Sequence, residues 1–89
     1  LFRSFCSVSN PNVVVEAVKK AEDGNAVIVR FYEAGNTRGQ TTLTFDRRVK
    51  QASECNLLEE GDAPVKTRRN SVTVPVAPFE IKTLKIVFD

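Results

Sequence analysis

The sequence predicts an all-β fold: an antiparallel β-sandwich, immunoglobulin-like, with seven to eight short strands. The first observation is an alternation of apolar and polar residues with a period of two, clearest at 71–76, where valine occupies every second position. Such alternation is typical of a strand with one buried face. The second is composition, because Val, Ile and Thr together supply 23 of 89 residues, and β-branched residues suit a pleated surface. The third is the short spacing of turn signals, which favours a sandwich or barrel.

Two further segments show the same alternation and are expected to be strands, 27–32 and 41–45. In the first, Val27, Val29 and Phe31 share one face, and in the second, Thr41, Leu43 and Phe45 do. The turn signals between strands are rich in Gly, Pro, Asn and Asp. They lie at 10–12, 22–25, 35–39, 46–47, 60–64, 69–70 and 75–78.

The segment Val13–Glu22 is the one place where a helix competes with a strand. Val14, Ala17, Val18 and Ala21 would share a helical face. Three consecutive valines disfavour a helix, because β-branched side chains lose rotamer freedom there. The Asp23-Gly24 signal followed by a clear strand also favours a hairpin.

The register of this hairpin is predicted from the separation of charged and apolar residues. A two-residue loop at Asp23-Gly24 would place Glu16 opposite Phe31, in the apolar row. A three-residue loop, 23–25, places Val15, Ala17 and Ala21 beside Val27, Val29 and Phe31. The second register keeps charges off the buried face, so it is the one we expect.

The last segment, 79–88, changes its parity along the strand. Phe79 and Ile81 fall on one face, whereas Leu84, Ile86 and Phe88 fall on the other. Either a bulge near Lys82-Thr83 reconciles the two halves, or the strand is buried on both faces. A strand this apolar is expected at the centre of a sheet or between domains. We expect its large apolar residues to be buried between neighbouring strands, namely Phe79, Ile81, Leu84, Ile86 and Phe88.

Charge and missing residue types exclude several function classes. The net charge of +2 does not fit a dedicated nucleic-acid binder, which carries a clustered basic excess. No apolar run approaches the roughly 18 residues of a membrane span, and no signal-peptide pattern is present. The sequence has no His, Met or Trp, so imidazole chemistry is excluded. Because it begins at Leu1 rather than Met, we expect residues 1–89 to be one domain of a longer multidomain chain.

The two cysteines, Cys6 and Cys55, have three interpretations. Reduced thiols in a cytoplasmic protein are the expected one, because small secreted domains usually carry four or more cysteines. A single disulfide bond between two strands is the second. A reactive or metal-binding thiol is the least supported, since no His or CxxC pattern accompanies either cysteine.

Charged clusters are candidate sites, and none of them predicts catalysis. Glu59, Glu60 and Asp62 cluster in a turn, where carboxylates are usually solvated. The basic clusters, Arg47-Arg48-Lys50 and Lys66-Arg68-Arg69, fit three roles: solvated charges that discourage edge pairing, contacts to another domain, or phosphate binding. The serines have no His to activate them, and Tyr32, the single tyrosine, is expected to pack across strands. No catalytic, metal-binding or cofactor-binding residue is therefore predicted.

One long stretch, Val13–Glu33, reads as an apolar strand, then Lys-Lys-Ala-Glu-Asp-Gly, then an apolar strand ending in Arg-Phe-Tyr-Glu. It resembles the C-terminal β-sandwich domain of glycoside hydrolase family 38 α-mannosidases. Thr42–Phe45, Asn56–Glu60 and Pro78–Leu84, the last reading Pro-Phe-Glu-Ile-Lys-Thr-Leu, resemble further segments of that domain in the same order. The resemblance extends from about Ser9 to Phe88.

This resemblance implies a function for the parent chain more than for these residues. The family's enzymes are zinc-dependent, retaining exo-α-mannosidases whose metal ligands and Asp nucleophile belong to a separate catalytic domain. None of those residues maps onto this sequence, so we expect no cofactor here, with zinc only in the catalytic domain. The implied role is a non-catalytic accessory domain that packs on preceding domains of an α-mannosidase. The alternative is a stand-alone carbohydrate- or protein-binding module.

Overall fold

The computed structural model describes residues 6–20, 26–56 and 63–89. Every regular element in these ranges is a β-strand, which confirms the all-β prediction. None of the described residues forms a helix that could cross a membrane. The predicted turn at 22–25 and most of the one at 60–64 lie outside the described residues. The strands are β1 (Cys6–Val8), β2 (Val13–Lys20), β3 (Ala26–Glu33), β4 (Gly39–Phe45), β5 (Val49–Cys55), β6 (Ala63–Pro64), β7 (Lys66–Arg68), β8 (Ser71–Val76) and β9 (Ile81–Phe88).

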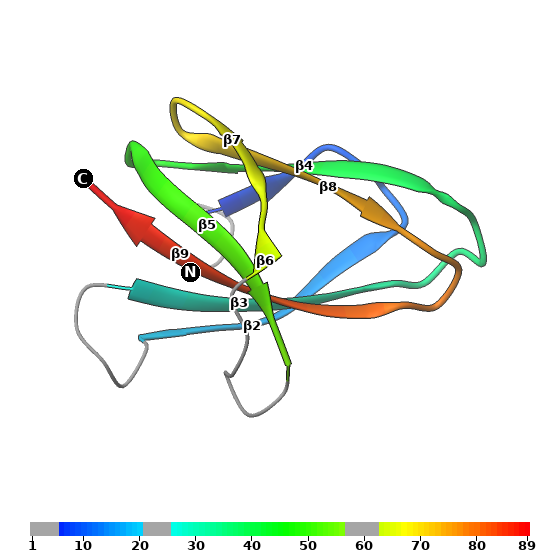
Figure 1. Ribbon diagram of the computed structural model, residues 1–89. Helices are drawn as coiled ribbons and strands as arrows, with labels where there is room; N and C mark the ends of the chain where they lie inside the picture. Colours follow the sequence, from blue (N-terminus) through cyan, green and yellow to red (C-terminus); the bar gives the residue numbers. More distant parts are fainter. Residues whose placement is uncertain (1–5, 21–25, 57–62) are drawn as a thin grey trace.

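The strands form two antiparallel sheets that stack as the layers of a sandwich (Figure 1). One sheet has four strands in the order β1-β4-β8-β7, and the other has five in the order β2-β3-β9-β5-β6. The described residues thus hold nine strands, and the excess over the seven to eight expected reflects pieces as short as the two-residue β6. The strand preference for 13–22 over a helix is confirmed by β2.

The core lies between the two sheets and follows the predicted alternation. Val72, Val74 and Val76 of β8 are buried, and so are Thr41, Leu43 and Phe45 of β4. From the five-stranded sheet, Phe31, Leu84 and Ile86 are fully buried against them. The rings of Phe45 and Phe88 meet edge to face with centroids 5.4 Å apart, an arrangement that favours aromatic pairs. This contact joins β4 of one sheet to β9 of the other.

The predicted hairpin register of β2 and β3 is wrong. Val18 lies opposite Val29, the register of the rejected two-residue loop, and Val15 lies opposite Phe31. A bulge between Val15 and Ala17 makes both pairings possible, because the extra residue, Glu16, has no partner on β3. Glu16 is exposed, so the bulge removes the charge from the apolar row. The prediction failed because it assumed one uniform register along the strand.

The central position of the last strand is confirmed, since β9 pairs with β3 on one side and β5 on the other. Of the two alternatives for the change of parity, the bulge near Lys82-Thr83 is absent, because β9 pairs with β3 without interruption from Ile81 to Val87. Thr83 and Leu84 lie on opposite faces of β9 and are both buried, which favours the alternative of burial on both faces. The irregularity of this region lies instead in β5, between Val49 and Gln51. β9 keeps one parity, so Leu84, Ile86 and Phe88 face the core.

The placement of Phe79 and Ile81 in the buried set is also wrong. Their side chains are 63% and 60% exposed. Ile81 lies on the outer face of β9, opposite in parity to Leu84. The residue that does share the inward parity at this end of β9 is Lys82, which is 8% exposed.

Candidate functional site

A cluster of loops at one end of the sandwich is organised around the buried carboxylate of Glu33. Glu33 ends β3 at an inward-facing position and is 1% exposed. Its Oε2 accepts hydrogen bonds from the backbone N–H of Gly35 at 2.8 Å, and from the backbone N–H and the hydroxyl of Thr37 at 3.1 and 2.8 Å. Its Oε1 accepts one from the backbone N–H of Phe79 at 2.9 Å. One side chain therefore joins the β3–β4 loop to the β8–β9 loop.

The hydrogen bonds of Glu33 keep its carboxyl group ionised despite burial. Burial alone raises the pKa of this group. The hydrogen bonds donated by Phe79, Thr37 and Gly35 outweigh that effect and lower the pKa of Glu33 from 4.5 to about 2. A carboxyl group with so low a pKa is a poor general acid at neutral pH, because it holds no proton to donate. The geometry gives Glu33 a structural role in fixing loops.

The loop between β1 and β2 joins the same cluster through Asn12. Its backbone oxygen accepts a 2.7 Å hydrogen bond from the N–H of Ala34, and its Nδ2 donates to Thr37 Oγ1 at 3.3 Å. Asn12 also lies directly against Gly35, and a Cβ added to this glycine would come within 2.5 Å of Asn12 Cγ. A side chain at Gly35 would therefore have to displace the end of the Asn12 side chain.

The β8–β9 loop presents an exposed aromatic residue in an unusual backbone conformation. Phe79 has a φ of 58°, in the left-handed region that bulky residues rarely occupy. The loop is held on both sides of it, because Glu80 Oε1 accepts from the Ala77 N–H at 2.9 Å and the Glu33 N–H donates to the Glu80 backbone oxygen at 3.0 Å. The cluster thus stabilises a strained turn whose phenylalanine is 63% exposed.

An ion-pair group lies beside this loop. The ammonium group of Lys82 is 3.0 Å from Glu54 Oε1 and 3.6 Å from Glu80 Oε2. Lys82 is almost fully buried, so its charge requires these partners. The pairs tie β9 to β5 and to the β8–β9 loop.

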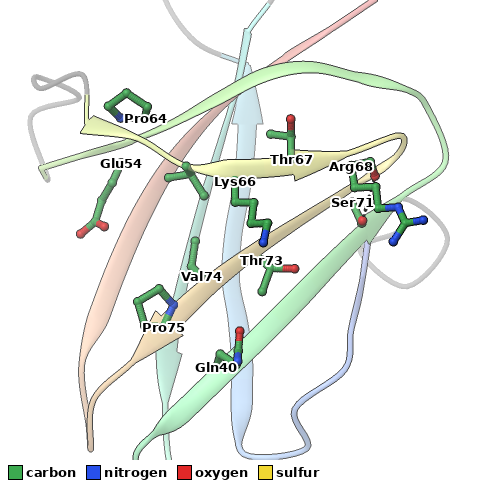
Figure 2. Close-up of a pocket in the computed structure, with 11 residues that line it drawn as sticks. Gln40, Glu54, Pro64, Lys66, Thr67, Arg68, Ser71, Thr73, Val74 and Pro75 are labelled. Carbon is green, nitrogen blue, oxygen red and sulfur yellow. Dashed lines mark hydrogen bonds between the residues drawn. The ribbon is translucent and has the colours of Figure 1, made fainter.

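A groove of about 760 Å³ lies over β7 and β8. Figure 2 shows Lys66 from β7 extending toward Thr73 of β8, with Glu54 at one end of the groove and Arg68 at the other. None of the described lining residues is aromatic, so the groove offers no ring on which a sugar could stack. Its lining combines charged side chains and hydroxyl groups with valine and proline side chains.

The structure brings residues of the two predicted basic clusters together. Arg47, Arg48 and Arg69 line a shallow depression of about 360 Å³ that also contains Asp46. Two of these arginines are already engaged, because the Arg47 guanidinium lies 5.0 Å from the Phe88 ring centroid and Arg48 Nε lies 3.5 Å from Asp89 Oδ2. The exposed Arg48–Asp89 ion pair and the Asp46 carboxylate offset part of the positive charge, so the geometry favours the solvated role. Glu59, Glu60 and Asp62 lie outside the described residues.

The residues that the structure describes do not fit a zinc site. The sequence has no His, and the described residues contain no group of three or more Cys, Asp or Glu that could hold a metal ion. Cys6 belongs to the core between the sheets, whereas Cys55 packs with Ala26 and Ile28 in a separate cluster. Both cysteines are buried and are not joined by a disulfide bond. Burial raises the pKa of the Cys6 thiol to about 11, which removes its nucleophilic form at neutral pH.

Glu33 and Phe79, the central residues of the loop cluster around the Glu33 carboxylate, were not predicted from the sequence as site residues. One signal for Glu33 was present, because it continues the inward parity of Val29 and Phe31 at the end of an apolar strand. A carboxylate at a core position needs hydrogen-bond donors. Nothing in the sequence near Phe79 signals its left-handed backbone, which depends on a hydrogen bond to a residue 46 positions away.

Comparisons with known proteins agree with the fold. The family model for the glycosyl hydrolases family 38 C-terminal beta sandwich domain matches residues 12–84. The chain is 36% identical to Alpha-mannosidase G of Dictyostelium discoideum over 90 residues, which is 96% of this chain and 8% of that protein. It is 34% identical to human and 31% identical to mouse Alpha-mannosidase 2C1 over 86 residues, 91% of this chain and 8% of each relative.

The chain thus spans less than a tenth of the length of the curated relatives it matches. The family match covers most of the chain, and the two-sheet sandwich is the architecture that the family's description names. The resemblance seen in the sequence is confirmed. This chain belongs to the C-terminal β-sandwich domain family of the family 38 glycosyl hydrolases, the α-mannosidases.

Proposed function

We propose that this chain is the non-catalytic C-terminal accessory domain of a zinc-dependent, retaining α-mannosidase that hydrolyses terminal α-mannosides. Its role is to brace the rest of the enzyme. The observation that supports this role is the hydrogen bonding of Glu33. Its buried carboxylate accepts four hydrogen bonds from two loops, and these bonds lower its pKa. That arrangement fixes the loops and gives Glu33 a structural role.

The partners of the domain follow from the same proposal. It packs against preceding domains of its own chain, which supply the zinc ligands and the nucleophile. No nucleic-acid or membrane partner is proposed, because the net charge is only +2. A cytoplasmic location is proposed on the basis of Cys6 and Cys55, two buried thiols that form no disulfide bond.

The alternative is a stand-alone binding module for carbohydrate or protein, and the groove over β7 and β8 would be its site. The groove gives the binding-module alternative little support, because its described lining lacks the aromatic side chains that sugar-binding surfaces commonly use. The two functions differ in what the domain does for its neighbours. A bracing domain stabilises the catalytic part, whereas a tethered binding module can be removed without loss of stability.

The experiment compares the full-length α-mannosidase chain with a version truncated before this domain. Thermal unfolding and zinc-dependent hydrolysis of an aryl α-mannoside are measured on both. We expect the truncated chain to unfold at a lower temperature, or to fail to accumulate as folded protein. A truncated enzyme with the unfolding midpoint and activity of the full chain would overturn the bracing role.

A further inference from the structure

The exposed large apolar side chains of the described residues gather at one end of the five-stranded sheet. They are Val14 at 41%, Phe79 at 63% and Ile81 at 60% exposed. Val14 lies opposite Tyr32 in the β2–β3 pairing, and Tyr32 lies opposite Ile81 in the β3–β9 pairing. Val14, Tyr32 and Ile81 therefore form a continuous row across three strands, on the outer face. Phe79 lies two residues before Ile81 in the turn that leads into β9, and it is the most exposed large apolar side chain of the described residues. We call these four residues the outer apolar row.

The rest of this outer face is not exposed in the same way. Ile28 and Ala26 of β3 are 2% and 3% exposed, and they pack with Cys55 of β5. Thr83 of β9 is 3% exposed and its hydroxyl accepts a hydrogen bond from Arg30 Nε at 3.4 Å. The outer face is thus covered along most of β3 and β9 and open at the outer apolar row. The exposure is local to the end that the Glu33 loop cluster holds.

The position of Phe79 is maintained against a conformational preference. A left-handed φ is unfavourable for a bulky residue, yet the turn fixes Phe79 there with its side chain exposed to solvent. The buried Glu33 carboxylate stabilises this turn through the Phe79 N–H. Strained residues of this kind persist where the surroundings stabilise them and often mark a binding surface. A residue whose backbone is already fixed also loses less conformational entropy on binding.

The size of the outer apolar row indicates what covers it. Four partly exposed side chains present on the order of 300 Å², given that a large aromatic residue buries roughly 150–250 Å². Stable complexes between separate molecules bury about 800 Å² on each partner, so the row is too small to hold a second copy by itself. A domain tethered in the same chain has a high effective concentration, so a smaller contact is sufficient. The matched segment is 8% of each relative's length, which leaves ample chain to supply such a domain.

We propose that the outer apolar row, Val14, Tyr32, Phe79 and Ile81, is the surface on which this sandwich docks against another folded domain of the same α-mannosidase chain. The proposal rests on the bracing role given above and names the surface that performs it. Glu33 is a positioning residue for this contact, because it holds the turn that presents Phe79. The opposite sheet, with the groove over β7 and β8, faces solvent.

The test is site-specific photo-cross-linking in the full-length chain. A benzophenone amino acid replaces Phe79 in one variant and Ile81 in a second, and Lys66, exposed on β7 of the opposite sheet, is replaced in a matched control. Each variant is first checked for aryl α-mannosidase activity, which shows that it has folded. After irradiation, cross-linked peptides are identified by mass spectrometry. A mixture of isotopically labelled and unlabelled chains separates contacts within a chain from contacts between two copies.

We expect positions 79 and 81 to cross-link, within one chain, to a peptide outside this domain, and position 66 not to do so. Cross-links from 79 or 81 to a second copy would overturn the proposal in favour of a homodimer contact. Cross-links from position 66 alone, or none from 79 and 81 in active enzyme, would overturn the choice of surface. In that case the bracing role is still decided by the truncation experiment, because loss of stability on truncation does not depend on which face is used.

Discussion

The Oε1 atom of Glu33 accepts a 2.9 Å hydrogen bond from the backbone N–H of Phe79, a residue 46 positions later in the chain. The carboxylate is buried and the phenylalanine side chain is exposed. The bond therefore connects the interior of the sandwich to a surface residue in a strained turn. It also sets the first prediction, because a hydrogen-bonded carboxylate makes stability depend on pH.

Replacing Glu33 with Gln is expected to destabilise the 89-residue chain most at neutral pH. The folded pKa of about 2 lies below the ordinary value of 4.5, so the ionised group contributes stability above pH 4.5 and loses it as the pH falls toward 2. Urea denaturation of wild type and Glu33→Gln from pH 7 to pH 2 measures this. The difference in unfolding free energy should shrink across that window, since Glu33 becomes neutral in the wild type as well.

The matched control is Glu16→Gln, at the exposed extra residue of the β2 bulge. Its stability should follow the wild type at every pH, because surface substitutions away from special features change little. A pH-independent gap between wild type and Glu33→Gln would show that Glu33 acts through shape alone and that its charge contributes nothing.

Substituting Gly35 with Ala is expected to lower the unfolding free energy of the chain by about 1 kcal/mol, roughly the net contribution of one hydrogen bond, because the end of the Asn12 side chain must move. The added Cβ would meet Asn12 Cγ at 2.5 Å and disturb the hydrogen bond of Asn12 to Thr37. Gly39→Ala is the control, because a Cβ there meets nothing within 4 Å. Chemical denaturation of both variants gives the comparison. Equal stability of the two would contradict the close contact in the loop cluster.

Truncating Leu84 to Ala is expected to lower the unfolding free energy of the isolated chain by about 2–5 kcal/mol, as for other fully buried leucines. Leu84 is fully buried in the central strand, whereas Ile81, three residues earlier, is 60% exposed. Ile81→Ala should therefore change stability by less than about 1 kcal/mol in the isolated chain. Similar losses for the two variants, measured by urea denaturation, would place Ile81 in the core and contradict the outer-face assignment.

Both cysteines are expected to be reduced and protected. Burial raises the pKa of Cys6 to about 11 and Cys55 is also buried, so neither thiol should react quickly with Ellman's reagent in the native protein at neutral pH. After denaturation without reductant, both thiols of each chain should react. Finding none would show a disulfide bond and contradict the cytoplasmic proposal.

Local patterns predicted the strands well, because one-sided burial leaves a period of two in the sequence. Val72, Val74 and Val76, and likewise Leu43 and Phe45, are buried as expected. The central position of β9 was also predictable, since an apolar strand needs cover on both sides. The registers were less predictable. A bulge such as the one at Glu16 changes the register within a strand, and its position depends on pairing that the sequence does not reveal.

The loop cluster was beyond sequence reasoning for a related reason. Phe79 and Ile81 are large apolar residues next to a core strand, so hydrophobicity alone assigned them to the interior. The exposure of Ile81 follows from the parity of β9, in which Lys82 takes the inward position and pairs with Glu54. Phe79 lies in the turn before this strand. That parity depends on the pairing of β9 with β3 and β5, which are distant in the chain.

The most direct test of the bracing role combines stability and activity in the full-length α-mannosidase. The double variant Phe79→Asp/Ile81→Asp introduces charge into the outer apolar row, and Lys66→Asp and Arg68→Asp together reverse the charge at two exposed positions of the opposite sheet as a control. Thermal unfolding is followed for each, and kcat/KM on an aryl α-mannoside is measured well below the unfolding transition. We predict a lower unfolding midpoint for the first pair only, with kcat/KM of the folded enzyme equal to that of the wild type. An unchanged midpoint for Phe79→Asp/Ile81→Asp, or a loss of kcat/KM without a change in midpoint, would contradict a domain that braces its enzyme through this surface.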